Sequence, residues 1–290
     1  MNPSPAAHLN WSAEALWQEL EPLLPGLSIE VLARCGSTNT ELLERLRQSG
    51  DEHASGASSA RGQARRSHDL QPCLLVAEHQ TQGRGRMGRS WIASPGASLT
   101  FSLALPMALA DTAGLSLAVG TVLADALEPP TEGALRIGLK WPNDLWLDGR
   151  KLGGILIETV PTGGQRMVII GIGLNILAEG KPVEGHAFAT GFASLDELYP
   201  GISAPRALAL LARPLVSLLA GYAAQGLAPQ LPAYQRRDLL RGQLISAGGL
   251  EGLGAGVNAE GELLMQTGSG APQVISGGEV TVRFAPEEPH

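Results

Sequence analysis

The chain has 290 residues, of which 44% are hydrophobic and only 4% aromatic, so it can bury a large core built mainly from Leu, Val, Ile and Ala. Its 28 acidic and 21 basic residues give a formal net charge of −7, which disfavours non-specific binding to nucleic acid or membrane surfaces. Two cysteines, Cys35 and Cys73, are too few for a disulfide framework and lack CxxC metal spacing, so we expect a reduced, cytoplasmic protein. The first ten residues lack a signal-peptide pattern, and no stretch of about 18 uncharged apolar residues predicts a membrane span.

The first predicted elements are short. An amphipathic helix is predicted from Ala13 to Leu24, ended by Pro25-Gly26, and residues 1–26 are interpreted as an N-terminal extension. A strand is predicted over 29–34. Thr38-Asn39-Thr40-Glu41 then matches a capping box, with leucines following at helical spacing and Gly50 as the expected stop.

Residues 49–71 are rich in Ser, Ala, Gly, Arg and Asp and nearly free of large apolar side chains. This composition predicts an exposed, mobile insertion. Its basic cluster of Arg61, Arg65 and Arg66 is either a contact for a partner or an ordinary solvated loop, and charge runs favour the solvated loop.

The middle of the chain alternates apolar strand patterns with helix patterns. Strands are predicted over 73–79, 98–106, 136–141, 144–147, 151–160 and 166–174. Helices are predicted over 111–127, with Asp111 or Thr112 as the cap, and over 205–223 and 229–240. Asp148-Gly149 predicts a hairpin turn between two of the strands.

Beyond about Arg241, short β-like pieces alternate with Gly-rich turns. They predict a small antiparallel barrel or sandwich over residues 241–286. Because a unit of about 45 residues is marginal alone, we expect it to dock on the main domain.

The segment Gly83-Arg84-Gly85-Arg86-Met87-Gly88-Arg89-Ser90-Trp91 concentrates three arginines in an acidic chain. Glycines let the backbone approach a ligand, and arginines offer forked donors for phosphate or carboxylate, so a flexible loop that closes over an anion is predicted. The GxGxxG-like spacing also suits a dinucleotide turn, but the arginines and the lack of a following helix argue against that. Trp91 either stacks on a base or anchors the loop in the core.

Three later segments place polar residues beside apolar strands. In Lys140-Trp141-Pro142-Asn143-Asp144, the carboxylate can hold Mg²⁺ and the lysine can contact phosphate, or the Asn-Asp pair is simply a turn. In Lys151-Leu152-Gly153-Gly154, the lysine faces a cleft or the solvent, and the glycines let a ligand lie against the strand. In Gly171-Ile172-Gly173-Leu174-Asn175, the asparagine reaches the same cleft or ends the strand.

In this order, the segments resemble the biotin protein ligases, also called biotin–[acetyl-CoA-carboxylase] ligases. The matching segments are Ser37-Thr38-Asn39, Gly83 to Trp91, Lys140 to Asp144, Lys151 to Glu158, Gly171 to Asn175, and, in the C-terminal part, Gly256-Val257-Asn258, Gly261-Glu262-Leu263-Leu264 and Gly277-Gly278-Glu279-Val280. The resemblance implies an α+β fold. A mixed β-sheet flanked by helices, as in class II synthetases, would form the catalytic domain over 27–240, and an SH3-like barrel would follow over 241–286.

The resemblance implies an ATP-dependent ligase that uses biotin, ATP and Mg²⁺. Such enzymes form biotinyl-5′-AMP and transfer biotin to a lysine of a carboxylase's biotin carboxyl carrier domain. This chemistry needs concentrated cationic donors and no side-chain nucleophile. Ser37 as a nucleophile would need a positioned base, and none of these segments contains a histidine.

The resemblance also implies roles for individual residues. The biotin site would comprise Ser37, Thr38, Asn39, Gln80, Arg84, Gly85, Arg86, Lys151, Gly153 and Gly154. Nucleotide contacts are expected from Arg86, Arg89, Trp91, Lys140, Asn143 and Asn175. Asp144 is the expected metal ligand, and Arg84, Arg86 and Lys151 are the expected catalytic residues.

Two further expectations concern the loop and the N-terminus. An acyl adenylate hydrolyses when water reaches it, so the arginine-glycine loop is expected to act as a lid. Some members of the family carry an N-terminal DNA-binding domain, for which the 36 residues before Ser37 are too few, so we expect a ligase that does not bind an operator, as a monomer or homodimer. The alternatives are a lipoate or octanoyl ligase of the same fold and a catalytically idle regulator that binds biotin or its adenylate.

Overall fold

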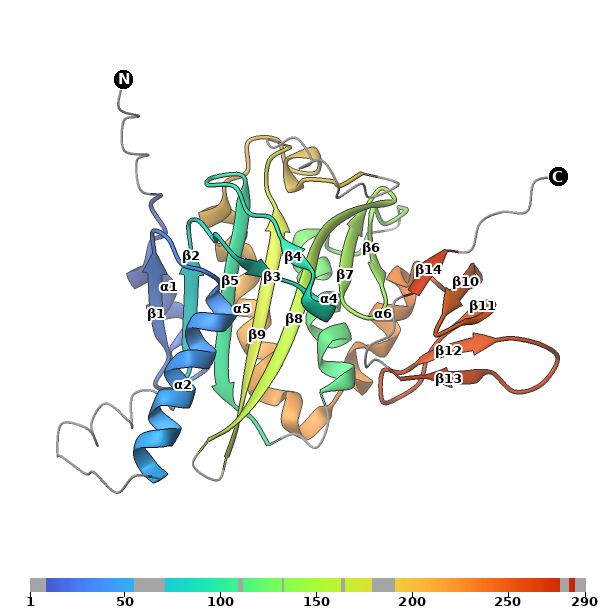
Figure 1. Ribbon diagram of the computed structural model, residues 1–290. Helices are drawn as coiled ribbons and strands as arrows, with labels where there is room; N and C mark the ends of the chain where they lie inside the picture. Colours follow the sequence, from blue (N-terminus) through green and yellow to red (C-terminus); the bar gives the residue numbers. More distant parts are fainter. Residues whose placement is uncertain are drawn as a thin grey trace.

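The structure is a computed structural model that describes residues 9–54, 71–108, 112–131, 133–162, 165–178, 191–276 and 282–284. A seven-stranded sheet with helices on both faces forms most of it, and a five-stranded sheet follows toward the C-terminus (Figure 1). The predicted Arg61, Arg65 and Arg66 cluster lies outside the described residues, as does the Gly277 to Val280 segment.

The main sheet is mixed, as predicted. Its strand order is β1-β2-β5-β9-β8-β7-β6. The strands are β1 (Ser28–Leu32), β2 (Cys73–Ala77), β5 (Ser98–Pro106), β9 (Gln165–Asn175), β8 (Arg150–Thr162), β7 (Asp144–Leu147) and β6 (Ile137–Lys140). β1 and β2 run parallel, whereas the other neighbours are antiparallel. The predicted hairpin turn joins β7 to β8, with positive φ angles of 47° at Asp148 and 75° at Gly149.

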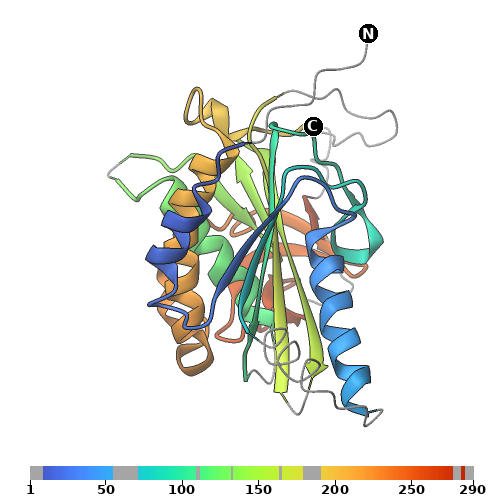
Figure 2. The same cartoon turned by 90° about the vertical axis from the view of Figure 1, so that its left-hand side faces the viewer.

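Helices cover the two faces of this sheet unequally. Figure 2 shows α1 (Ala13–Leu20), α4 (Ala113–Leu127) and α5 (Ala204–Gln225) on one face and α2 (Thr38–Ala54) on the other. The main core lies between the sheet and the first group, and a smaller cluster lies under α2. Strand β5 serves both faces, because Phe101 belongs to the main core while Ala104 packs in the cluster under α2.

The start and end of α2 differ from the prediction. The carbonyl of Ser37 accepts the N–H of Glu41 at 2.9 Å, but the Thr38 hydroxyl lies against Gln80 and Ser102 and does not cap the helix. The predicted capping box is therefore wrong. The helix also continues past Gly50 to Ala54, so its predicted stop is wrong and the first residues of the predicted insertion are helical. An interior glycine costs a helix only about 1 kcal/mol, which is too little to end it.

The other helices match the predicted positions with different ends. α1 stops at Leu20, and α6 (Leu231–Arg237) is shorter than predicted. Thr112 is the N-cap of α4, without a side-chain cap bond. By length and apolar composition α5 is long enough to cross a membrane, but its buried residues pack toward α4, α1 and β5, as in a core helix.

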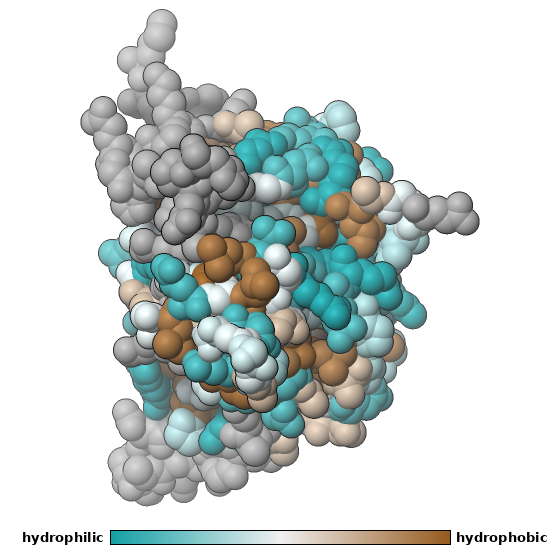
Figure 3. All heavy atoms as spheres, turned by 90° about the vertical axis from the view of Figure 1, so that its right-hand side faces the viewer, coloured by the Kyte–Doolittle hydropathy of each residue, from teal (hydrophilic) through white to brown (hydrophobic). Residues whose placement is uncertain are grey.

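The C-terminal sheet is antiparallel and docks on the main domain, as predicted. Its order is β13 (Gln273–Ile275), β12 (Leu263–Gln266), β11 (Leu250–Val257), β10 (Leu244–Ala247) and β14 (Val282–Phe284). The indole Nε1 of Trp141 donates to the carbonyl of Gly261 at 3.0 Å, which ties the two parts together. On the outer side, Leu244 and Leu253 pair across two strands and are 46% and 48% exposed. Figure 3 shows apolar side chains gathered on this side of the molecule.

Candidate active site

A buried polar cluster lies between the start of α2 and the sheet. The backbone after β1 runs beside the backbone after β2, since Cys35 bridges Gln80 and the N–H of Gln82 donates to Gly36. This pairing brings Gln80 against α2, where its Oε1 accepts the N–H of Thr38 at 2.7 Å. Ser37, Thr38, Asn39 and Gln80 are all at least 93% buried. So many buried polar groups in one place are uncommon in a hydrophobic core, which makes this cluster a candidate binding site.

Asn39 is held from both sides. Its Nδ2 donates to Glu158 Oε2 at 2.9 Å and to the carbonyl of Leu156 at 3.3 Å, and its Oδ1 lies 2.6 Å from Ser102 Oγ. A Cβ added at Gly171 would lie 2.2 Å from Asn39 Oδ1, so only glycine leaves room for the amide. The first glycine of the Gly171-Ile172-Gly173 segment thus makes space for a site residue.

The arginine-glycine segment forms a small hairpin. β3 (Gly83–Arg84) pairs with β4 (Ser90–Trp91), and the N–H of Gly85 donates to the carbonyl of Arg89 at 2.7 Å. The tip turns through Met87 and Gly88, whose φ angles are 56° and 69°. Figures 1 and 2 show the hairpin on the face of the sheet that α2 covers. The arginines are therefore presented from an ordered turn beside the buried polar cluster.

Two arginines of the hairpin contact residues of the sheet. Arg84 pairs with Glu158 at 3.0 Å, the same carboxylate that accepts from Asn39. Arg86 Nη1 lies 3.3 Å from Asn143 Oδ1. Burial lowers the pKa of the Arg86 guanidinium; the nearby Asp144 opposes this effect and Arg89 adds to it. A partly desolvated guanidinium gains most from an anionic partner, so Arg86 is suited to bind one.

Asp144 and Lys151 form an ion pair beside Arg86. Their Oδ1 and Nζ lie 2.8 Å apart, with the two side chains 23% and 20% exposed. Asp144 stands opposite Lys140 on β6 and Gly154 on β8. A Cβ at Gly154 would lie 3.4 Å from Asp144 Oδ1. The predicted cations Lys140 and Lys151 therefore flank one carboxylate at the same end of the sheet.

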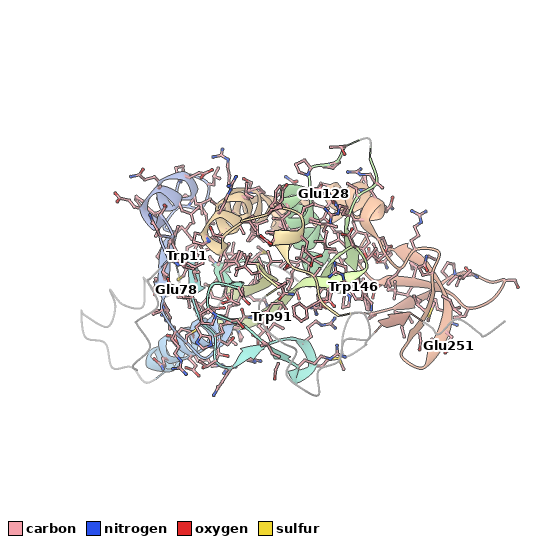
Figure 4. The ribbon with its side chains drawn as sticks, turned by 90° about the horizontal axis from the view of Figure 1, so that it is seen from above. Trp11, Glu78, Trp91, Glu128, Trp146 and Glu251 are labelled. Carbon is pink, nitrogen blue, oxygen red and sulfur yellow. The ribbon has the colours of Figure 1, made fainter. Side chains whose placement is uncertain are left out.

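Two aromatic rings line this region. A Cβ on Gly173 would lie 2.5 Å from Cε2 of Trp91, so the indole rests on the backbone of β9. Trp91 Nε1 is buried and has no hydrogen-bond partner. The ammonium of Lys140 stands 4.7 Å from the centre of the Trp146 ring. Figure 4 places Trp91 near the middle of the molecule, between the Trp11 and Glu78 pair and Trp146.

Asn175 and Gly153 hold the backbone of this region. Asn175 Nδ2 donates to the carbonyls of Ala193 at 3.0 Å and Lys151 at 3.4 Å, which fixes the strand that carries Lys151. A Cβ at Gly153 would lie 2.5 Å from the carbonyl of Gly173, so close strand packing alone requires glycine there. Nucleotide contact by Asn175 and ligand contact at Gly153 stay predictions.

Comparison with known proteins identifies the family of this chain. The sequence profile of the Biotin/lipoate A/B protein ligase family matches residues 61–175. The biotin–[acetyl-CoA-carboxylase] ligase of Mycobacterium tuberculosis is 34% identical, over 87% of this chain and 88% of that protein. The bifunctional ligase/repressor BirA of Escherichia coli is 34% identical over 90% of this chain and 76% of its own length. The chain belongs to the biotin protein ligase family.

Solved structures of biotin protein ligases share the fold of this chain. A biotin protein ligase from Aquifex aeolicus, in complex with biotin and ATP, matches with a TM-score of 0.68 at 24% identity, over 89% of this chain and 99% of that chain. A biotin acetyl coenzyme A carboxylase synthetase from Helicobacter pylori matches with a TM-score of 0.53 at 24% identity, over 85% and 99%. The predicted α+β architecture is confirmed.

Two polar residues of the candidate site were not predicted from the sequence. Ser102 is fully buried in the centre of β5 and touches both Thr38 and Asn39. Glu158 joins Asn39 to Arg84, although it was noted only as the end of a motif. The available signal was a polar residue within each apolar strand pattern, because such residues must face a partner.

Asp144, the predicted metal ligand, has few other acidic or metal-binding side chains around it in the part of the chain that the structure describes. Among the described residues, no three His, Cys, Asp or Glu side chains gather closely enough to hold a metal ion by themselves. Asp144 is a single carboxylate beside Lys140, Lys151 and Asn143. This donor set fits Mg²⁺ that arrives with a nucleotide, since Mg²⁺ is commonly held by one or two carboxylates plus phosphate oxygens.

Proposed function

We propose that this chain joins biotin to ATP, forming biotinyl-5′-AMP, and then transfers biotin to a lysine of a carboxylase carrier domain. One observation supports this most directly: Glu158 links the buried polar pocket at Asn39 to the cationic hairpin at Arg84. A neutral polar ring system and a carboxylate are the two ends of biotin. The two kinds of site lie side by side on one face of the sheet.

In the first reaction, a biotin carboxylate oxygen bonds to the α-phosphorus of ATP, and the bond to the bridging oxygen breaks as pyrophosphate leaves with its electron pair. Negative charge is concentrated where these groups meet. Arg84, Arg86 and Lys151 supply fixed cations on the side of the sheet where the polar pocket lies. Pre-positioned cations stabilise the transition state without reorganising.

Mg²⁺ would be held by Asp144, with Asn143 nearby, and would neutralise charge on the phosphates of ATP. The ammonium of Lys151 lies 2.8 Å from Asp144 Oδ1. This ion pair restrains both side chains, so Lys151 can contact a phosphate and Asp144 can hold the metal ion with little loss of conformational entropy.

In the second reaction, the neutral amine of an acceptor lysine attacks the carbonyl of the mixed anhydride, and AMP leaves. The adenylate must be protected from water until then. We assign this protection to the hairpin tip, with exposed Met87 and half-buried Arg86. The acceptor lysine then approaches from the solvent side.

The test is a coupled assay on the purified chain with MgATP, a biotin carboxyl carrier domain and either biotin or lipoate. Pyrophosphate release and a one-biotinyl mass increase of the acceptor, with biotin alone, are expected. Activity with lipoate alone would support a lipoate ligase, and tight binding of biotin without pyrophosphate release would support an idle regulator. A carrier domain with its lysine changed to arginine is the control, and it should stay unlabelled.

We also propose that the partner is a carrier domain, that operator DNA is not bound, and that the enzyme works in the cytoplasm as a monomer or a homodimer. Operator binding by the purified chain in a mobility-shift assay would contradict the absence of DNA binding.

A further inference from the structure

Ser102 is the most deeply buried polar residue beside the proposed biotin pocket. It sits in the centre of β5 with no exposed surface. Its Oγ lies 2.6 Å from Thr38 Oγ1 and 2.6 Å from Asn39 Oδ1. Both contacts have the length of strong O–H···O hydrogen bonds, yet a serine hydroxyl carries only one proton. The surrounding partners decide where that proton goes.

The other partners of Asn39 determine the direction of its hydrogen bond with Ser102. Its Nδ2 faces Glu158 Oε2 at 2.9 Å and the carbonyl of Leu156 at 3.3 Å, and both of these oxygens can only accept. The amide nitrogen must therefore point at them, which leaves Oδ1 toward Ser102. Because Oδ1 can only accept, the single proton of Ser102 is donated to Asn39.

The second contact then has a fixed direction as well. With its own proton on Asn39, Ser102 Oγ can only accept at its 2.6 Å contact with Thr38. The proton of Thr38 is therefore drawn to Ser102. Gln80 Oε1, 3.1 Å from Thr38 Oγ1, is an acceptor that already takes the N–H of Thr38. Thr38 Oγ1 and Gln80 Oε1 are thus two neighbouring buried acceptors, and no side-chain proton lies between them.

We propose that Ser102 is a positioning residue that keeps Thr38 in the acceptor state, so that Thr38 Oγ1 and Gln80 Oε1 together receive an N–H of the substrate's cyclic urea. This rests on the proposed function. Adjacent buried acceptors favour a ligand that brings a donor, and they disfavour one that presents oxygen or a methyl group at the same point. Ser102 thereby contributes to the choice of biotin over acids that lack a urea, such as lipoate, without touching the substrate.

The decisive variant is Ser102→Ala. It frees the Thr38 proton to turn toward Gln80 Oε1, so one of the two acceptors is lost. We expect the Kd and KM for biotin to rise about tenfold, as for one hydrogen bond of about 1.4 kcal/mol, while kcat for adenylate formation changes less than about twofold.

The specific readout uses two analogues, the cyclic carbamates in which one or the other urea N–H is replaced by oxygen. For the analogue that lacks the N–H facing Thr38, Ser102→Ala should cause no further loss of affinity, measured by calorimetry. For the other analogue, the tenfold loss should persist. A merely structural role of Ser102 would weaken all three ligands equally, and that result would overturn the proposal.

Thr100→Val is the matched control. Thr100 lies two residues away on the same strand and the same face, is 98% buried, and donates to the carbonyl of Ala77 at 3.0 Å. It contacts neither Thr38 nor Asn39 in the hydrogen bonds described, so its loss should leave the preference between analogues unchanged. A preference shift as large as that of Ser102→Ala would overturn the assignment.

A second variant keeps the test usable if Ser102→Ala does not fold. Ser102→Cys preserves the volume but donates weakly, and we expect an intermediate loss for biotin with the same pattern across the analogues. Wild-type affinity for both carbamates equal to that for biotin would also overturn the proposal. If the wild-type chain binds biotin with this preference but forms no adenylate, the proposed function fails and the assignment of Ser102 stands.

Discussion

The two faces of the main sheet are built from the same strands, but one face packs the hydrophobic core and the other carries the candidate site. On β5, Leu99, Phe101 and Leu103 are fully buried in the main core. The alternate residues Thr100 and Ser102 point to the face under α2 and form hydrogen bonds there. One strand therefore contributes to the hydrophobic core with one set of side chains and supports the buried polar cluster with the other.

Strand β9 shows the same division. Ile170 and Ile172 belong to the main core, whereas Gly171 and Gly173 lie on the site face and leave space for Asn39 and Trp91. Because core packing dominates stability and polar contacts dominate the site, substitutions on the two faces should separate stability from activity. This separation can be tested from either side.

The largest effect is expected on the core face. Phe101→Ala removes a fully buried ring between β5 and the helices behind it, and should lower the free energy of unfolding by about 3–5 kcal/mol. The measurement is a urea titration followed by circular dichroism. The biotin affinity of the folded fraction should stay within about twofold of wild type. A large loss of biotin affinity at unchanged stability would contradict the division between a core face and a site face.

Lys151→Met tests the site face. We propose that this lysine faces the reacting phosphate, so its removal should lower kcat for pyrophosphate release about 10²–10³-fold, with a small change in the unfolding midpoint. Arg150→Met is the control, because Arg150 is the preceding residue and pairs with Glu197 outside the cationic cluster. Equal losses of kcat in both variants would show that positive charge anywhere on this strand matters. That result would contradict a specific contact between Lys151 and the reacting phosphate.

Arg86→Gly tests the hairpin as a lid. Without the contact to Asn143, the tip should cover the adenylate less well, and biotinyl-5′-AMP should dissociate at least about tenfold faster. Escaped adenylate would label exposed lysines of a bystander protein, detected by mass spectrometry. Met87→Gly is the control: Met87 has a φ of 56°, so glycine suits its backbone and Arg86 is kept. Unchanged dissociation with Arg86→Gly would contradict the lid.

Local sequence patterns predicted much of this arrangement, and long-range contacts account for what they missed. The alternation of residues 98–106 and the Asp148-Gly149 turn each carry their own signal within a few residues. Ser102 differs, because its partners lie 63 and 64 positions away in sequence. The capping box failed for the same reason: Thr38 finds Gln80 across 42 positions, and that tertiary contact overrides the local motif.

The smallest effect concerns the contact between the main domain and the C-terminal sheet. Trp141→Phe keeps the buried ring but removes the hydrogen bond to the carbonyl of Gly261. A net loss of about 1 kcal/mol is expected, which corresponds to about fivefold faster amide exchange in residues 258–266. Trp17→Phe removes a bond of the same kind, from Nε1 to the carbonyl of Leu27 at 2.8 Å, on the other side of the molecule. Since α1 packs on β1 and α5, this control should speed exchange near α1 and leave 258–266 unchanged. Faster exchange at 258–266 in both variants would mean that the C-terminal sheet follows global stability. Faster exchange in Trp141→Phe alone would show that it is attached through the segment that carries Asn143 and Asp144.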